Sequence, residues 1–155
     1  MKNILAFLFY WAFWIGYFVT NKLIYMGYHF DKSLKLDLTT FIGVFFNGLK
    51  LDIAFASYLA IVPGLIITLG NFRPSTKIAQ SLKLYNTVVL LLTSFIIVAD
   101  LELYKAWGFR IDGTTFKYLS APTEMIASVW SSPLFLLIAF WMLTYFAFKY
   151  LFNQY

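Results

Sequence analysis

Long runs of apolar residues with almost no charge decide what this sequence can fold into. A helix crosses the roughly 30 Å of bilayer hydrocarbon with about 20 residues. Four segments reach or approach this length: 4–25, 53–70, 84–99 and 133–152. We therefore expect an all-α integral membrane protein with four transmembrane helices, which makes the 155 residues a single membrane domain.

The composition argues against a soluble domain. Hydrophobic residues make up 61% and charged residues 12% of the chain, whereas soluble domains average about 45–50% and about 25%. The sequence has no cysteine, which excludes disulfides and thiolate metal sites. Its net charge of +5 comes from basic residues spread between apolar runs. We expect membrane lipid as the partner of these residues, and no nucleic acid.

The ends of the spans are less sharply defined than their centres. Because only 16 residues separate the charges that flank 84–99, this helix is expected to begin earlier, near Ser75. Pro63 should kink the second span locally. Segment 38–49 is uncharged but too short to cross a bilayer, so it either extends the second span outward or forms an amphipathic or re-entrant piece.

Four spans place both chain ends on the same side of the membrane. The first span lacks a following small-x-small cleavage site, so we interpret it as a retained helix and not as a signal peptide. Lys and Arg counts alone do not decide the orientation. With the N-terminus in the cytoplasm, one face is purely basic and the outer face carries every acid, which suits an anionic inner leaflet. The acids are Asp31, Asp37, Asp52, Asp100, Glu102, Asp112 and Glu124.

A tetrad of apolar, basic, apolar and acidic residues occurs three times, at 34–37, 49–52 and 109–112. In an extended segment its base and acid share a face and could pair with each other. In a helix the two side chains point nearly opposite ways, so each needs a partner from elsewhere. One alternative is that these side chains simply extend from the span end to the membrane surface. The other is that they form ion pairs, and the sequence then suggests Asp52 with Arg110, and Lys50 with Asp100 or Glu102.

The expected outer loop, 100–123, carries more polar and aromatic residues than a connection needs. Pro122 and Glu124 fit the first and third positions of a new helix. Turn, aromatic belt and helix cap account for most of this stretch, and Arg110 is explained least well. His29, the only histidine, is expected to be an interfacial polar residue, because one histidine with scattered carboxylates makes a poor metal site.

The order of these features resembles the N-terminal membrane domain of bacterial lipoteichoic acid synthase-like proteins, the membrane sulfatase or phosphoglycerol transferase family. The resemblance covers essentially the whole chain. It rests on the stretch DLELYKAWGFRIDGTTFKYLSAPTEMIAS at 100–128 and on GLKLD at 48–52, which enters a span containing Tyr58 and Pro63.

The resemblance implies five spans followed by an extracytoplasmic catalytic domain that uses a threonine nucleophile and a divalent metal, commonly Mn²⁺. These 155 residues contain four expected spans and no such domain. No nucleophile or metal ligand of the family can therefore be placed on this sequence. The implied location is the bacterial cytoplasmic membrane, and the implied partner is the chain's own catalytic domain.

The sequence alone carries no catalytic apparatus and no cofactor site. Its expected function is to anchor and orient the catalytic domain and to contact a lipid headgroup. Arginine recognises phosphate through bidentate hydrogen bonds. The candidate substrate-binding residues are Lys50, Asp52, Arg110, Asp112 and Glu124. A self-contained small membrane protein, such as a transporter or assembly subunit, is the alternative from another functional class.

Overall fold

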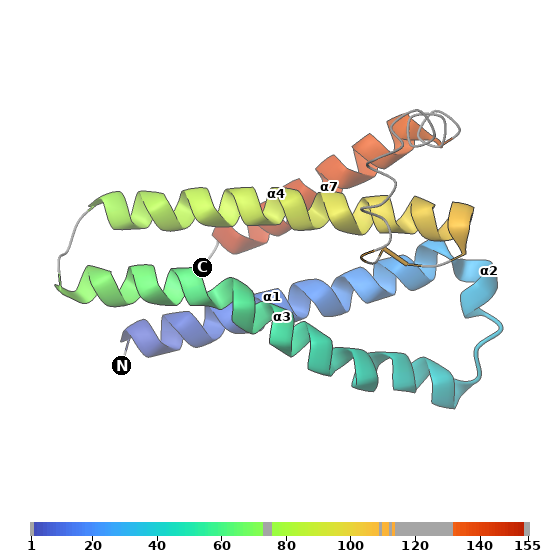
Figure 1. Cartoon of the computed structure of the whole chain (residues 1–155), viewed down its shortest axis with the longest axis horizontal. Helices are drawn as coiled ribbons and strands as arrows, with labels where there is room; N and C mark the ends of the chain where they lie inside the picture. The colour runs from blue at the N-terminus through green and yellow to red at the C-terminus, as the bar shows by residue number, and fades with distance from the viewer. Residues whose placement is uncertain (1, 73–75, 109, 112, 114–131, 154–155) are drawn as a thin grey trace. The chain divides into compact units, whose positions relative to one another are not determined.

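The computed structural model of the chain is all-helical over the residues it describes, 2–72, 76–108, 110–111, 113 and 132–153. It has four long helices, α1 (Lys2–Tyr28), α3 (Leu38–Phe72), α4 (Thr76–Trp107) and α7 (Leu134–Asn153), and a single-turn helix, α2 (Phe30–Ser33). The four long helices are each long and apolar enough to cross a membrane. The expectation of four membrane-spanning helices is confirmed (Figure 1).

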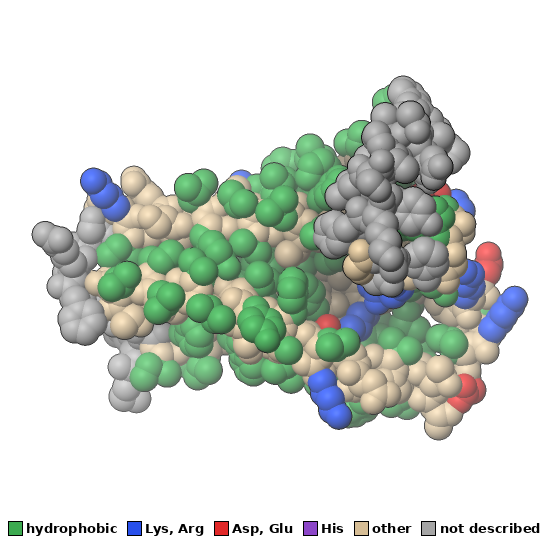
Figure 2. Space-filling model, viewed as in Figure 1, with side chains coloured by type: hydrophobic (Ala, Val, Ile, Leu, Met, Phe, Trp, Pro, Cys, Tyr) green, Lys and Arg blue, Asp and Glu red, His purple; other side chains and the backbone are tan. Residues whose placement is uncertain are grey.

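Outward-facing apolar side chains cover these helices. Leu38, Leu51 and Phe135 are 73%, 74% and 93% exposed, and Figure 2 shows hydrophobic side chains along the helical surfaces. Scattered apolar residues are normal on soluble proteins, but helices that are apolar on nearly every side are typical of membrane spans. The surfaces therefore suit contact with lipid.

Contacts group the chain into two units, residues 1–87 and 88–155, each described here by itself. In the first unit, α1 packs on α3. Ala56 and Ala60 are buried on α3, and small residues of this kind let two membrane helices approach closely. The ring of Phe18 lies edge-on to that of Phe55, with centroids 5.3 Å apart.

The first turns of α4 belong to the same unit and bind both neighbouring helices through hydroxyl groups. Tyr10 on α1 donates to Asn86 Oδ1 at 2.8 Å. Tyr85 donates to the carbonyl oxygen of Leu59 on α3 at 2.9 Å. Hydrogen bonds of this kind link helices in the hydrocarbon region, where no water competes for the donors.

The contact with Leu59 explains how α3 tolerates a buried proline. Pro63 lies inside the helix and has no backbone N–H, so the carbonyl four residues earlier, that of Leu59, loses its helical partner. The Tyr85 hydroxyl replaces that donor. Neighbouring helices commonly satisfy backbone groups freed by proline in membranes. Figure 1 shows α3 bending along its length, although the helix is unbroken from Leu38 to Phe72.

In the second unit, Trp141 holds α7 to the later part of α4. Its indole Nε1 donates to the carbonyl oxygen of Leu91 at 3.2 Å and to Ser94 Oγ at 3.1 Å. Its ring lies edge-on to Phe95, with centroids 5.4 Å apart. The indole therefore combines apolar packing with a satisfied donor.

Two helix boundaries differ from the sequence expectation in an informative way. Residues 38–49 belong to the same continuous helix as the second span. Residues 100–107, expected to start the outer loop, are the last turns of α4. Their charges interrupt the apolar pattern without interrupting the helix, because Glu and Lys are good helix formers. The expected start of α4 near Ser75 agrees with its first residue, Thr76.

Candidate functional site

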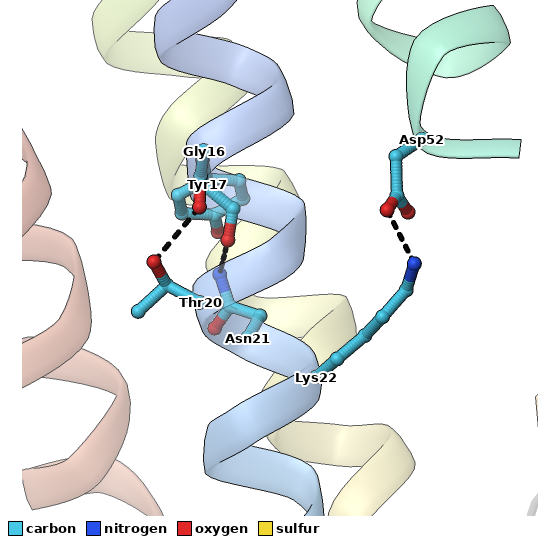
Figure 3. Close-up of polar contacts among 6 residues, drawn as sticks. All are labelled: Gly16, Tyr17, Thr20, Asn21, Lys22 and Asp52. Atoms are coloured by element: carbon cyan, nitrogen blue, oxygen red, sulfur yellow. Dashed lines mark hydrogen bonds and ion pairs between the residues drawn. The ribbon is translucent and has the colours of Figure 1, made fainter. Parts of the chain in front are cut away.

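Asp52 lies on α3 and faces α1, where it forms an ion pair with Lys22 (Figure 3). The side chains of Lys22 and Asp52 are 18% and 9% exposed. A carboxylate this deeply buried is costly unless it is paired and hydrogen-bonded. The ion pair therefore links α1 and α3 at the height of Lys22 and Asp52 along their axes.

Gly48 makes room for this contact. A methyl group built at Gly48 would lie 2.9 Å from Lys22 Cε and closer still to its ammonium nitrogen. Gly48 precedes Asp52 by one helical turn, so both residues line the same side of α3. Together they form a slot in which the lysine side chain crosses Gly48 to reach the carboxylate.

The residues next to Lys22 on α1 bond to their own helix. Thr20 Oγ1 donates to the carbonyl of Gly16, and Asn21 Nδ2 donates to that of Tyr17, each at 2.8 Å. Figure 3 shows Lys22 reaching toward α3 while Thr20 and Asn21 turn back onto α1. Of these three neighbours, Lys22 alone is drawn toward α3.

Lys50, two residues before Asp52, is exposed. This agrees with the expectation that a lysine and an aspartate at this spacing point apart when the segment is helical. Among the described residues, the ion pairs are Lys22–Asp52, Lys105–Glu102 and Arg110–Asp100. Lys50 is in none of these three pairs, and its suggested pairing with Asp100 or Glu102 stays a prediction.

Arg110 pairs with Asp100 on α4, whereas the sequence suggested Asp52 as its partner. Its Nε and Nη2 donate to Asp100 Oδ2 at 2.8 and 2.6 Å. The backbone N–H of Ile111 donates to the other carboxylate oxygen, Oδ1, at 2.7 Å. Asp100 is only 4% exposed. One buried carboxylate on α4 therefore fixes both the side chain of Arg110 and the backbone that follows it.

The end of α4 has a backbone shape that allows this return. Gly108 follows the last helical residue with a φ of +77°, and its N–H bonds to the carbonyl of Tyr104 at 2.9 Å. Glycine at this position is a common helix terminator, because it adopts the left-handed conformation without steric cost. The chain then turns back, and the Arg110 side chain stays 63% exposed.

The three tetrads therefore have three different structures. At 49–52 the backbone is helical, and the acid binds a lysine of another helix. At 34–37 the acid precedes α3, and Asp37 accepts hydrogen bonds from Thr39 and from the hydroxyl and N–H of Thr40. In the third tetrad, Arg110 binds Asp100 ten residues earlier. The place of a charged residue in the tetrad therefore does not determine which residue it binds.

Two of the five candidate residues, Asp112 and Glu124, lie outside the described residues, as does the expected helix start at Pro122. Asp52 and Arg110 are assigned to separate ion pairs. The sequence analysis did not identify Lys22 as a partner of Asp52. Gly48, one turn before the only acid bordering the second span, was the available signal.

The described residues offer no group of three His, Cys, Asp or Glu side chains that could hold a metal ion. The ring of His29 contacts those of Tyr25 and Tyr28, with centroid distances of 4.8 and 5.2 Å. It is 9% exposed, so it is a packed residue at the end of α1.

Comparisons with protein-family models, curated proteins and solved structures found no match to this chain.

Proposed function

We propose that this chain is the membrane-embedded N-terminal part of a lipoteichoic acid synthase-like enzyme, and that it anchors and orients an extracytoplasmic catalytic domain in a bacterial cytoplasmic membrane. Four apolar helices of spanning length support the anchoring role. The sequence resemblance over 100–128 and 48–52 supports the family.

A lipid headgroup contact at Arg110 is the second part of the proposal. The observation that carries it is the geometry of the guanidinium: Asp100 holds one edge, while most of the side chain remains exposed. A guanidinium held in this way is preorganised for a phosphate oxygen, because less side-chain freedom is lost on binding. The exposed Lys50 is a second candidate contact for anionic lipid.

Lipid retention tests the headgroup contact. The chain is purified from membranes containing phosphatidylglycerol, and the anionic lipid retained after a mild detergent wash is counted by mass spectrometry. Loss of one charge-assisted contact, worth about 1.5–3 kcal/mol, should lower the affinity for the lipid about ten- to a hundredfold in Arg110→Ala, and retention with it. Lipid retention by Arg110→Lys should lie between that of wild type and that of Arg110→Ala, because lysine keeps the charge but lacks the planar guanidinium group.

Lys105→Ala is the matched control, since this lysine has a similar exposure, 61%, and lies near the end of α4, the helix that precedes Arg110. Retention should be unchanged in this variant. Equal retention by wild type and Arg110→Ala would remove the headgroup role and leave anchoring alone. Arg110→Ala also unpairs Asp100, so its helix content must first be matched to wild type by circular dichroism.

Orientation tests the anchoring role separately. The chain has no cysteine, so single cysteines can be introduced without background. A membrane-impermeant maleimide added to intact cells should label Asp31→Cys and should leave Lys77→Cys unlabelled, both positions being exposed. The reverse pattern would place a following catalytic domain in the cytoplasm and contradict the proposal.

A further inference from the structure

α3 is much longer than one membrane crossing. Its 35 residues extend about 52 Å at about 1.5 Å per residue, whereas bilayer hydrocarbon is about 30 Å thick. Tilting can accommodate part of the difference, since membrane helices tilt by about 20° on average. A substantial length of α3 must still lie outside the hydrocarbon.

The Lys22–Asp52 pair indicates which part is outside. Lys2 and Lys22 lie in α1, and the 20 residues between them correspond to about 30 Å of helix. Asp52 and the last residue of α3, Phe72, are likewise separated by about 30 Å. Both helices thus measure one hydrocarbon thickness from the ion pair to their other end, which places the pair at a membrane boundary.

Residues 38–51 of α3, which we name the α3 arm, lie beyond this boundary. The arm exposes large apolar residues: Leu38 is 73%, Ile42 44% and Phe46 71% exposed. These three residues recur every four positions and so form one stripe along the helix. The exposed polar residues of the arm, Thr39, Thr40, Asn47 and Lys50, lie on other sides of the helix, where Val44 and Leu51 are also exposed, at 38% and 74%.

Neither water nor the hydrocarbon core suits such a segment. Exposing the apolar stripe to water costs roughly 25 cal/mol for each Å². Burying Lys50 in the hydrocarbon is also unfavourable unless its ammonium reaches the surface. An amphipathic helix satisfies both demands in the headgroup layer, with its apolar side toward the acyl chains. In Figure 1 the first part of α3 diverges from α1, and α2 stays beside the end of α1, so most of the arm leaves the packed helix pair.

We propose that the α3 arm is a membrane-surface element of this protein, seated in the headgroup layer of the bilayer that its own helices cross. Leu38, Ile42 and Phe46 face the acyl chains. Thr40, Asn47 and Lys50 face water and the headgroups. The Lys22–Asp52 pair marks the point where the arm meets the span. This inference is independent of the proposed enzyme family.

Single-cysteine variants of the full chain in phosphatidylcholine–phosphatidylglycerol vesicles test the proposal. Thr40→Cys and Asn47→Cys should react with a membrane-impermeant maleimide, and Ile42→Cys and Phe46→Cys should react at least tenfold more slowly. A nitroxide at position 42 or 46 should be more accessible to oxygen than to a water-soluble nickel chelate. The same label at position 40 or 47 should show the opposite preference.

Each other outcome overturns the proposal in a recognisable way. Equal rapid labelling at all four positions would mean that the arm stands in water. Absence of labelling at all four would mean that it enters the hydrocarbon. Slow labelling of Ile42→Cys that persists in lipid-free detergent, with a disulfide formed between two chains, would assign the stripe to a second copy of the protein. Gel filtration and circular dichroism confirm that each variant is folded.

Discussion

The phenolic oxygen of Tyr85 lies 2.9 Å from the carbonyl oxygen of Leu59, the acceptor that Pro63 leaves without its helical N–H. A side chain of α4 thus completes the backbone hydrogen bonding of α3. The contact also connects a kink-prone position to a particular neighbouring helix, so proline and tyrosine should be energetically coupled.

This coupling predicts a non-additive double-mutant cycle. Tyr85→Phe removes the hydroxyl and should lower the free energy of unfolding by about 0.5–1.5 kcal/mol. In a Pro63→Ala background the new N–H at residue 63 can bond to Leu59, so Tyr85→Phe should cost clearly less there. Unfolding by sodium dodecyl sulfate in mixed micelles measures all four proteins. An equal cost in the two backgrounds would show that the hydroxyl does not serve the carbonyl freed by proline.

The Lys22–Asp52 pair predicts that removing one partner is worse than removing both. Lys22→Met leaves a buried carboxylate unpaired and should cost on the order of 3 kcal/mol. The double variant Lys22→Met/Asp52→Leu carries no charge and should recover most of that loss. The same micelle titration provides the measurement. If the double variant is as unstable as the sum of the two single variants, the charges are not coupled.

Gly48 predicts a more selective effect on the same pair. Gly48→Ala places a methyl group on the path of Lys22, so the ammonium must shift away from Asp52. Stability should fall in wild type and should be almost unchanged in Lys22→Ala, where the path is empty. Gly43→Ala on the same helix is the matched control, because its methyl would meet only Asn47 Nδ2, at 3.7 Å. A loss that persists without Lys22 would contradict the role of this slot.

The sequence was sufficient to locate the four long helices, but it did not predict which residues make contacts between them. Apolar runs locate spans because the hydrocarbon thickness sets a minimum length, and the third helix could even be extended back to within one residue of Thr76. Charges inside a helix leave its boundary undefined, and for this reason residues 100–107 were mistaken for loop.

Which charged residues form ion pairs depends on the rotation of each helix about its axis and on where the helices cross. A local sequence pattern contains neither kind of information. Lys22 and Asp52 are 30 residues apart, and their contact requires a particular rotation of both α1 and α3. Arg110 binds Asp100 because the chain turns back beside α4 at Gly108. The alternation of charges in the tetrads correctly predicted that Lys50 and Asp52 diverge in a helix, but it could not identify what each would meet.

The turn of the chain after α4 predicts that a glycine is required at position 108. Gly108→Ala forces a side chain into the left-handed region, which costs roughly 1–2 kcal/mol, and should loosen the Arg110–Asp100 contact. Hydrogen exchange of the Ile111 amide, which bonds to Asp100, reports on this contact directly. Gly113→Ala is the control, since its methyl would meet open space. Unchanged protection of Ile111 in Gly108→Ala would show that the return does not need glycine.

Asp37 predicts a dependence on acid at the start of α3. Hydrogen bonds from Thr39, then from the hydroxyl and N–H of Thr40, lower the pKa of Asp37 from 3.8 to about 2. Because the folded pKa lies below the usual value, the carboxylate stabilises the helix start at and above pH 4, and this contribution is lost as the pH falls toward 2. The carboxyl carbon of Asp37, followed by NMR, should titrate with a midpoint near 2. Asp37→Asn should remove the pH dependence of the protection of the Thr40 amide, which is its exchange rate relative to the intrinsic rate at each pH. A midpoint near 3.8 would show that the two threonines do not hold the carboxylate.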